Sequence, residues 1–110
     1  VILMTRHEKS LQHALSVLTS ERYRAYLDAI YLYGSCARGD QKYTSDVDLL
    51  LKLRKNVPAG ILRSMRVEAT PDDWELPEVE LKYFLGERFS QSSQFDRNVR
   101  EEGKLLWVRE

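Results

Sequence analysis

Two short runs of the sequence carry residues whose types and spacing suit chemistry on a phosphate. In the first run, Gly34 and Ser35 follow a stretch of β-forming residues. Glycine lets a backbone turn sharply and approach a ligand closely, and a serine that opens a helical turn offers its hydroxyl and amide hydrogens to a phosphate. In the second run, Asp46 and Asp48 share one face of a predicted strand and present adjacent carboxylates, which suit magnesium. The sequence therefore predicts a phosphate-binding turn beside a metal site.

Further side chains are candidates for the same site. Glu78 and Glu80 alternate with apolar residues over 78–84, so both share one face of a later predicted strand, and either could supply a third carboxylate. Glu80 is favoured because apolar neighbours on both sides would hold its backbone in place, whereas Glu78 follows Pro77 at the start of the strand. Arg38 is a candidate phosphate ligand on its chemistry alone.

The cysteine and the histidines favour ordinary structural roles. Cys36 is the sole cysteine, which excludes an internal disulfide, and two histidines are too few to complete a zinc site with it. Because no histidine partner is evident, Cys36 is predicted to pack near the site rather than to act as a nucleophile. His7 and His13 lie six residues apart on different faces of a predicted helix, and both are expected at the surface.

Helices and strands alternate along the chain and must position these residues. Thr5 followed by Glu8 is a capping-box pattern that predicts the start of a helix. The predicted helices cover residues 6–19, 58–69 and 87–102, the last between Gly86 and Gly103, and the predicted strands cover residues 29–33, 45–53, 78–84 and 105–108. These elements predict an α/β fold with a small mixed sheet of about four strands and helices packed mainly on one face.

The pattern of the second and third strands predicts where the acidic residues lie. In the second strand, Val47, Leu49, Leu51 and Leu53 are expected to face the core, with Asp46, Asp48, Leu50 and Lys52 on the opposite face. A helix between the second and third strands would join them in parallel and bring their starts to the edge of the sheet near Gly34.

Length and composition limit the class of protein. The 110 residues, with 17 basic and 17 acidic side chains, predict a single domain over 1–110. No apolar run approaches the roughly 20 residues that span a bilayer, and a lone cysteine suits a reducing compartment, so a cytoplasmic location is expected. A net charge of zero gives no indication of a nucleic-acid partner.

The two runs together resemble the nucleotidyltransferase superfamily of DNA polymerase beta, and in particular its minimal nucleotidyltransferases. The matching residues are Gly34, Ser35, the intervening residues 37–40, Ser45, Asp46 and Asp48. The match is dense from residue 32 to residue 51, and the order of later elements is similar to that of the family. Glu78 or Glu80 would stand where the family usually has a third aspartate, which is a departure in the length of that side chain.

The resemblance implies the polymerase-beta-like fold and a metal-dependent transfer of a nucleoside monophosphate, AMP from ATP, to an acceptor hydroxyl. It implies that Asp46 and Asp48 bridge two magnesium ions, that Glu80 holds the ion that activates the acceptor, and that Gly34 and Ser35 hold the triphosphate. A non-catalytic module that binds a nucleotide or a partner through the same surface is the alternative.

A separate chain is expected to supply the acceptor, because these 110 residues leave no room for an acceptor-binding domain. The resemblance implies a helical partner of the HEPN type, an RNase toxin for which the chain would be the antitoxin. The aromatic residues Tyr23, Tyr26, Trp74 and Trp107 exceed what four short strands would hide. They therefore predict an interface with such a partner or with a second copy of the chain.

Overall fold

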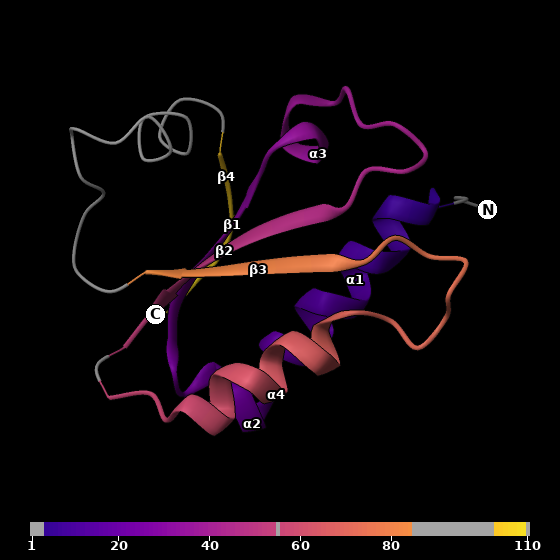
Figure 1. The fold of residues 1–110 in the computed structure, drawn as a ribbon. Helices are drawn as coiled ribbons and strands as arrows, with labels where there is room; N and C mark the ends of the chain where they lie inside the picture. Colours follow the sequence, from indigo (N-terminus) through magenta and orange to yellow (C-terminus); the bar gives the residue numbers. More distant parts are fainter. Residues whose placement is uncertain (1–3, 55, 85–102, 110) are drawn as a thin grey trace.

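The computed structural model describes residues 4–54, 56–84 and 103–109 (Figure 1). Its elements are α1 (Arg6–Leu18), α2 (Glu21–Arg24), β1 (Leu27–Tyr33), α3 (Ser35–Arg38), β2 (Val47–Leu53), α4 (Ala59–Ala69), β3 (Val79–Phe84) and β4 (Lys104–Val108). The order of helices and strands follows the prediction, and the short helices α2 and α3 are additions to it. The helix predicted over 87–102 lies outside the described residues.

The four strands form one mixed sheet in the order β3-β2-β1-β4. Strand β1 pairs antiparallel with both β2 and β4, and β2 pairs in parallel with β3 through the connection that contains α4. The end of β1 therefore meets the starts of β2 and β3 at one edge of the sheet, as the sequence predicted. This edge is called the site edge below.

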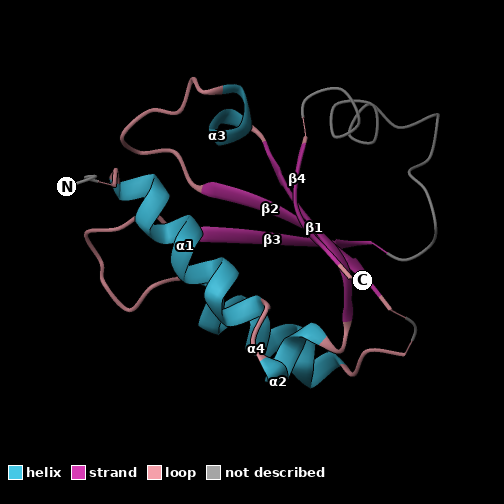
Figure 2. Ribbon diagram, turned by 180° about the vertical axis from the view of Figure 1, so that it is seen from behind, coloured by secondary structure: helices cyan, strands magenta, loops and turns pink. Residues whose placement is uncertain are grey.

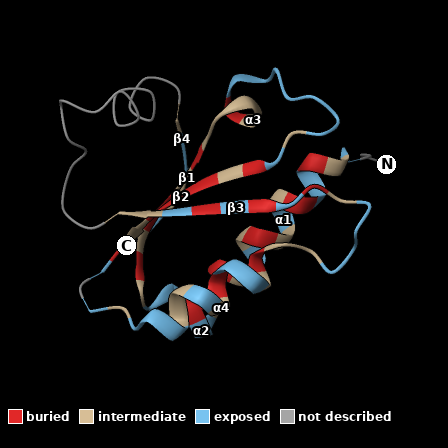
Figure 3. Ribbon diagram, viewed as in Figure 1, coloured by how far each residue is buried: buried red, intermediate tan, exposed pale blue. Residues whose placement is uncertain are grey.

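Helices α1, α2 and α4 pack together on one side of the sheet, while α3 stands apart from them at the site edge (Figure 2). The core lies between these helices and the sheet, and buried positions occur in α1, α4 and the strands β1, β2 and β3 (Figure 3). Representative core residues are Ala14 and Leu18 of α1, Ile30 of β1, Leu49 and Leu51 of β2, Met65 of α4 and Leu81 of β3. Among the described residues, no helix is both long enough and apolar enough to cross a membrane.

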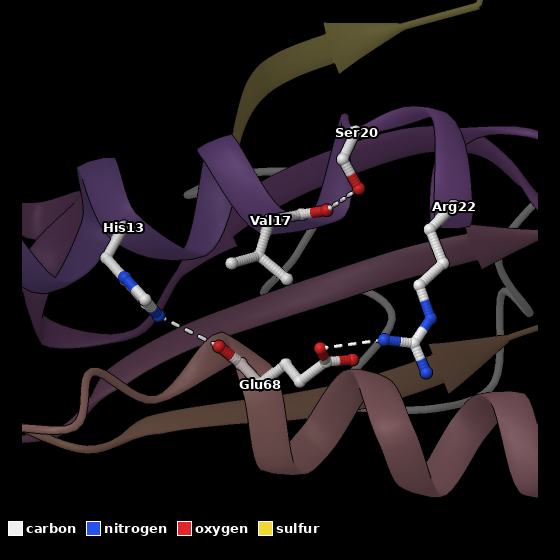
Figure 4. A network of polar contacts seen from close by, with 5 residues as sticks. All are labelled: His13, Val17, Ser20, Arg22 and Glu68. Atoms are coloured by element: carbon white, nitrogen blue, oxygen red, sulfur yellow. Dashed lines mark hydrogen bonds and ion pairs between the residues drawn. The ribbon is translucent and has the colours of Figure 1, made fainter.

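Helix α1 begins as predicted, because the Thr5 side chain accepts a hydrogen bond from the amide of Glu8 at 3.1 Å. Polar contacts then fasten the helices to one another (Figure 4). The Nε2 atom of His13 lies 2.8 Å from the carbonyl oxygen of Glu68 in α4, and the Glu68 carboxylate pairs with Arg22 of α2 at 2.9 Å. The Arg22 pair is exposed, so its contribution is about 0–1 kcal/mol.

Several expectations about burial are wrong. His7 was expected at the surface but is buried, because it continues the inward-facing stripe of α1. Tyr23 belongs to the core rather than to an interface, whereas Trp74 remains 91% exposed. Leu50 is buried although it shares the sheet face of Asp48. An alternating pattern assigns a face to each residue, but it does not show how much of that face is covered.

Candidate active site

The turn after β1 has a backbone geometry that only glycine adopts readily. Gly34 has φ 74° and ψ −156°, a conformation that side chains strongly disfavour. Helix α3 follows at once, and its first hydrogen bonds run from the amides of Ala37 and Arg38 to the carbonyl of Gly34. The amides of Ser35 and Cys36 precede that ladder, as the first amides of every helix do. The predicted Gly-Ser turn is therefore present at the site edge.

Asp48 lies directly against this turn. A Cβ atom placed on Gly34 would come within 2.6 Å of the Oδ2 atom of Asp48, which is closer than real Cβ contacts. The absence of a side chain at residue 34 thus leaves the space that the Asp48 carboxylate occupies. The turn and the carboxylate, predicted separately from the sequence, form one compact arrangement.

A row of three polar side chains crosses the sheet at this point. Tyr33 pairs with Asp48 across β1 and β2, and Asp48 pairs with Glu80 across β2 and β3. Residues paired in this way project from the same face of a sheet, so the two carboxyl groups are neighbours. The register places Glu80 beside Asp48, while Glu78 precedes β3.

The electrostatics of the row reflect this crowding. Burial, followed by the charge of Glu80 and a hydrogen bond with it, raises the pKa of Asp48 to about 6, and the charge of Asp46 adds to the effect. Burial and the charges of Asp48 and Glu80 also raise the pKa of Tyr33, so its hydroxyl stays protonated at neutral pH. Negative charge therefore accumulates at a place where a cation would relieve the repulsion.

Asp46 occupies a different position from the one expected. It precedes β2, which begins at Val47, and it is exposed rather than held within the strand. Its carbonyl oxygen lies 3.6 Å from the Sγ atom of Cys36, and the amide of Val47 donates to the carbonyl of Glu78 at 2.9 Å. The starts of β2 and β3 are thereby joined to each other, and α3 contacts the first of them.

A surface hollow of about 380 Å³ runs along β3 at the same edge. Its lining includes Asp46, Arg66, Glu78, Glu80 and Lys82. Carboxylates from the starts of two strands thus face a space open to a ligand, and cationic groups stand beside them.

The sequence also matches a known family. Residues 18–110 match the profile described as "Polymerase beta, Nucleotidyltransferase". The chain belongs to the polymerase beta nucleotidyltransferase family. No curated protein matches the chain at a significant level.

Solved structures support the nucleotidyltransferase fold. A protein from Sulfolobus solfataricus assigned as a nucleotidyltransferase superposes with a TM-score of 0.55 at 20% identity, over 97% of this chain and 91% of the other. A structure titled as a toxin-antitoxin with AMP-PNP gives a TM-score of 0.59 at 20% identity, over 93% of this chain and 73% of the other. At this identity the likeness establishes the fold alone, and the polymerase-beta-like α/β fold predicted from the sequence is confirmed.

The family uses metal ions, and the donor set here fits magnesium. Asp48 and Glu80 offer hard carboxylate oxygens side by side, and Asp46 stands close enough for its charge to act on Asp48. Within residues 4–54, 56–84 and 103–109, no three acidic, histidine or cysteine side chains gather tightly enough to hold an ion by themselves. Magnesium usually combines one or two carboxylates with substrate phosphates and water, so a nucleotidyltransferase site does not need a complete cage of side chains.

The other predicted site residues have ordinary surroundings in this structure. Ser35 begins α3, and Arg38 pairs with Asp40 through Nε and Oδ2 at 3.2 Å. Burial and the charge of Asp48 raise the pKa of the Cys36 thiol against a smaller opposing effect of Ser35. Cys36 packs against the core, as predicted, and the raised pKa disfavours the thiolate form that a nucleophile would need.

Two polar side chains that the sequence did not suggest reach the site edge from α1. The Nε2 atom of His7 lies 2.8 Å from the carbonyl oxygen of Ser45, and the Ser10 hydroxyl donates to the carbonyl of Pro77 at 2.7 Å. The available signal was their spacing, because both residues continue the buried stripe of the helix toward its start. Polar residues on such a stripe are expected to find partners.

Proposed function

We propose that the chain is a metal-dependent nucleotidyltransferase that moves AMP from ATP to an acceptor hydroxyl. The observation that carries this proposal is the position of Asp48, between the Gly34 turn on one side and Glu80 on the other. A phosphate-binding turn and a pair of carboxylates at one sheet edge supply the two functions that nucleotidyl transfer requires. The family match supports the same reaction class.

In the proposed reaction each site residue has a distinct role. Gly34 and Ser35 hold the triphosphate through the turn and the first amides of α3, and Arg38 adds positive charge when it exchanges its partner Asp40 for a phosphate. Asp46, Asp48 and Glu80 would hold two magnesium ions. Magnesium bound there would supply positive charge for the attacking and leaving oxygens.

The proposed step conserves its atoms and charges. The acceptor oxygen forms a bond to the α-phosphorus of ATP, and the bond from that phosphorus to the oxygen bridging the β-phosphate breaks. Pyrophosphate leaves with the bonding electrons, and the acceptor proton passes to water. The chain itself orients the triphosphate and gathers the carboxylates, so no covalent intermediate with the protein is required.

We also propose that the acceptor lies on a separate helical protein of the HEPN type, with this chain as the antitoxin. The structural likeness to a protein solved as a toxin-antitoxin with AMP-PNP supports this assignment. The exposed Trp74 near the site edge gives such a partner an aromatic anchor. A second copy of the chain is the competing occupant of that surface.

The deciding experiment combines the full chain, ATP labelled at the α-phosphate, magnesium and a purified helical protein of the HEPN type. Labelled partner is expected with the parent protein and not with Asp48→Asn. The matched control is Asp28→Asn, because Asp28 is an aspartate of β1 that pairs with Arg54 and Arg109 and is not a predicted site residue. Tight binding of Mg-ATP without any transfer would favour the non-catalytic module instead.

A further inference from the structure

A side chain of helix α1 contacts the backbone at Ser45, immediately before the candidate metal ligand Asp46. The Nε2 atom of His7 contacts the carbonyl oxygen of Ser45, the residue before Asp46. A carbonyl oxygen only accepts hydrogen bonds, so Nε2 carries the hydrogen in this contact. His7 is 9% exposed, and the contact joins residues 38 positions apart in the sequence.

The same helix also hydrogen-bonds to the backbone just before β3, at Pro77. Ser10 is fully buried, and its hydroxyl donates to the carbonyl of Pro77, the residue before Glu78. Because His7 and Ser10 are three residues apart, they lie on one face of the helix. One helix face therefore contacts a backbone carbonyl just ahead of each of the strands β2 and β3.

A third side chain of α1, Arg6, makes similar contacts closer to the surface. The Nε atom of Arg6 donates to the carbonyl of Glu75 at 2.8 Å, and its Nη1 atom donates to the carbonyl of Tyr43 at 3.1 Å. Its guanidinium also stacks over the Tyr43 ring, 3.8 Å from the centre. Arg6 thus ties the segment before β2 to the segment before β3.

These contacts are more than the packing of an amphipathic helix. Burying a histidine and a serine costs free energy unless each finds a hydrogen-bond partner, and apolar residues would cover the core without that requirement. Here both partners are backbone carbonyls at the site edge. Asp46 stands outside β2, so its backbone has no strand pairing of its own to fix it.

We propose that α1 is the positioning element of the carboxylate site, with His7 and Ser10 as positioning residues for the segments that lead into β2 and β3. This inference rests on the proposed function for its link to catalysis. The family match begins at residue 18, so these side chains lie ahead of the matched residues.

The test compares two histidines on the same helix. His7 and His13 both place Nε2 at 2.8 Å from a backbone carbonyl, but His13 contacts Glu68 in α4, away from the site edge. His7→Leu and His13→Leu each remove one such bond and are expected to lower thermal stability by similar amounts. His7→Gln returns a donor at the position of Nε2 and serves as the rescue variant.

Two readouts separate positioning from general stability. The first is hydrogen exchange of residues 42–47 in the free protein, which is expected to be about tenfold faster in His7→Leu, as the loss of one hydrogen bond predicts. The second is the affinity for magnesium with α,β-methylene-ATP, whose carbon bridge resists transfer. It is expected to fall about tenfold in His7→Leu, to recover in His7→Gln, and to be unchanged in His13→Leu.

Equal behaviour of the two leucine variants in both readouts would overturn the positioning role, as would a failure of His7→Gln to restore them. If the parent protein binds no analogue, the proposed function fails instead. Hydrogen exchange still decides the inference in that case, because unchanged exchange of residues 42–47 in His7→Leu means that His7 does not hold the segment.

Discussion

The Oδ2 atom of Asp48 lies so close to Gly34 that a Cβ atom added to this glycine would come within 2.6 Å of it. The backbone of Gly34 adds a second constraint, since its φ of 74° and ψ of −156° belong to a region reserved for glycine. The turn after β1 and strand β2 thus depend on each other: the turn requires glycine, and the Asp48 carboxylate requires the space that this glycine leaves.

Gly34→Ala is therefore expected to damage both the turn and the carboxylate. Backbone strain alone costs about 1–3 kcal/mol of the free energy of unfolding, and the collision displaces Asp48. Urea unfolding is expected to show this loss, and titration calorimetry is expected to show that Mg-ATP binding is abolished.

Gly39→Ala is the matched control. Gly39 also has a positive φ, 82°, but beyond its neighbours along the chain no atom lies within 4 Å of a Cβ placed there. Gly39→Ala is expected to lower the free energy of unfolding by roughly 1 kcal/mol and to retain the Mg-ATP affinity of the parent protein. If the two alanine variants lose the same affinity, the contact between Gly34 and Asp48 has no part in binding.

The raised pKa of Asp48 predicts how stability changes with pH. Its folded pKa of about 6 lies above the ordinary value of 3.8, so the folded protein binds this proton more tightly than the unfolded chain does. The resulting stabilisation is complete below the unfolded pKa and is lost as the pH rises through 6. In metal-free buffer, the parent protein is expected to gain stability from this group between pH 7.5 and pH 5.

Asp48→Asn removes that titration and serves as the control. At pH 7.5 without metal the variant is expected to be more stable than the parent protein, because the repulsion with Glu80 is gone. Magnesium is expected to raise the melting temperature of the parent protein at pH 7.5, and to do so much less in the variant. Identical pH profiles for the two proteins would contradict the assigned coupling.

The site edge could be predicted from the sequence because its signals are local. The residues around Gly34 specify a turn at the end of a strand, and alternation places Asp48 and Glu80 on one face of their strands. The helical crossover through α4 makes β2 and β3 parallel, and it therefore brings the starts of the two strands together.

The roles of His7 and Ser10 could not be predicted in this way. Their partners lie 38 and 67 residues away in the sequence, so only the assembled fold brings them together. Asp46 fell outside its predicted strand for a related reason. Alternation shows which residues could pair, whereas the tertiary contacts at the end of a sheet determine where pairing stops.

The identity of the third carboxylate leads to a direct comparison. Glu80 pairs with Asp48, whereas Glu78 precedes β3. Glu80→Gln is expected to leave Mg-ATP affinity nearly intact, because in the proposed site Asp46 and Asp48 would still hold a metal with the triphosphate. It is expected to lower AMP transfer by roughly a hundredfold or more. Glu78→Gln is expected to retain transfer close to that of the parent protein, measured with labelled ATP and the partner.

If Glu78→Gln lowers transfer and Glu80→Gln does not, the third carboxylate of the site is Glu78. If neither substitution changes transfer while Asp48→Asn abolishes it, the reaction does not depend on a carboxylate from β3.

Trp74 is the residue through which a partner is expected to dock. It is 91% exposed and lines a hollow of about 530 Å³ together with Arg6, Lys9 and Tyr43. An aromatic ring beside cationic side chains is typical of the residues that dominate protein interfaces. Because Arg6 also contacts the segment before β3, a partner bound here would lie next to the site edge and could present its acceptor to the nucleotide.

Trp74→Ser is therefore expected to leave the stability of the isolated chain within about 0.5 kcal/mol, since the ring is almost wholly in water. It is expected to weaken the complex with the helical partner by about 2 kcal/mol, roughly thirtyfold in Kd, as truncation of an anchor does. Val67→Ser is the matched control, because Val67 is 77% exposed on α4 and lines a different hollow. Surface plasmon resonance with the purified partner measures the Kd of the two variants, and Val67→Ser is expected to bind like the parent protein. If Val67→Ser weakens the complex and Trp74→Ser does not, the partner docks on the helix layer, and the acceptor must then reach the site edge from that side of the sheet.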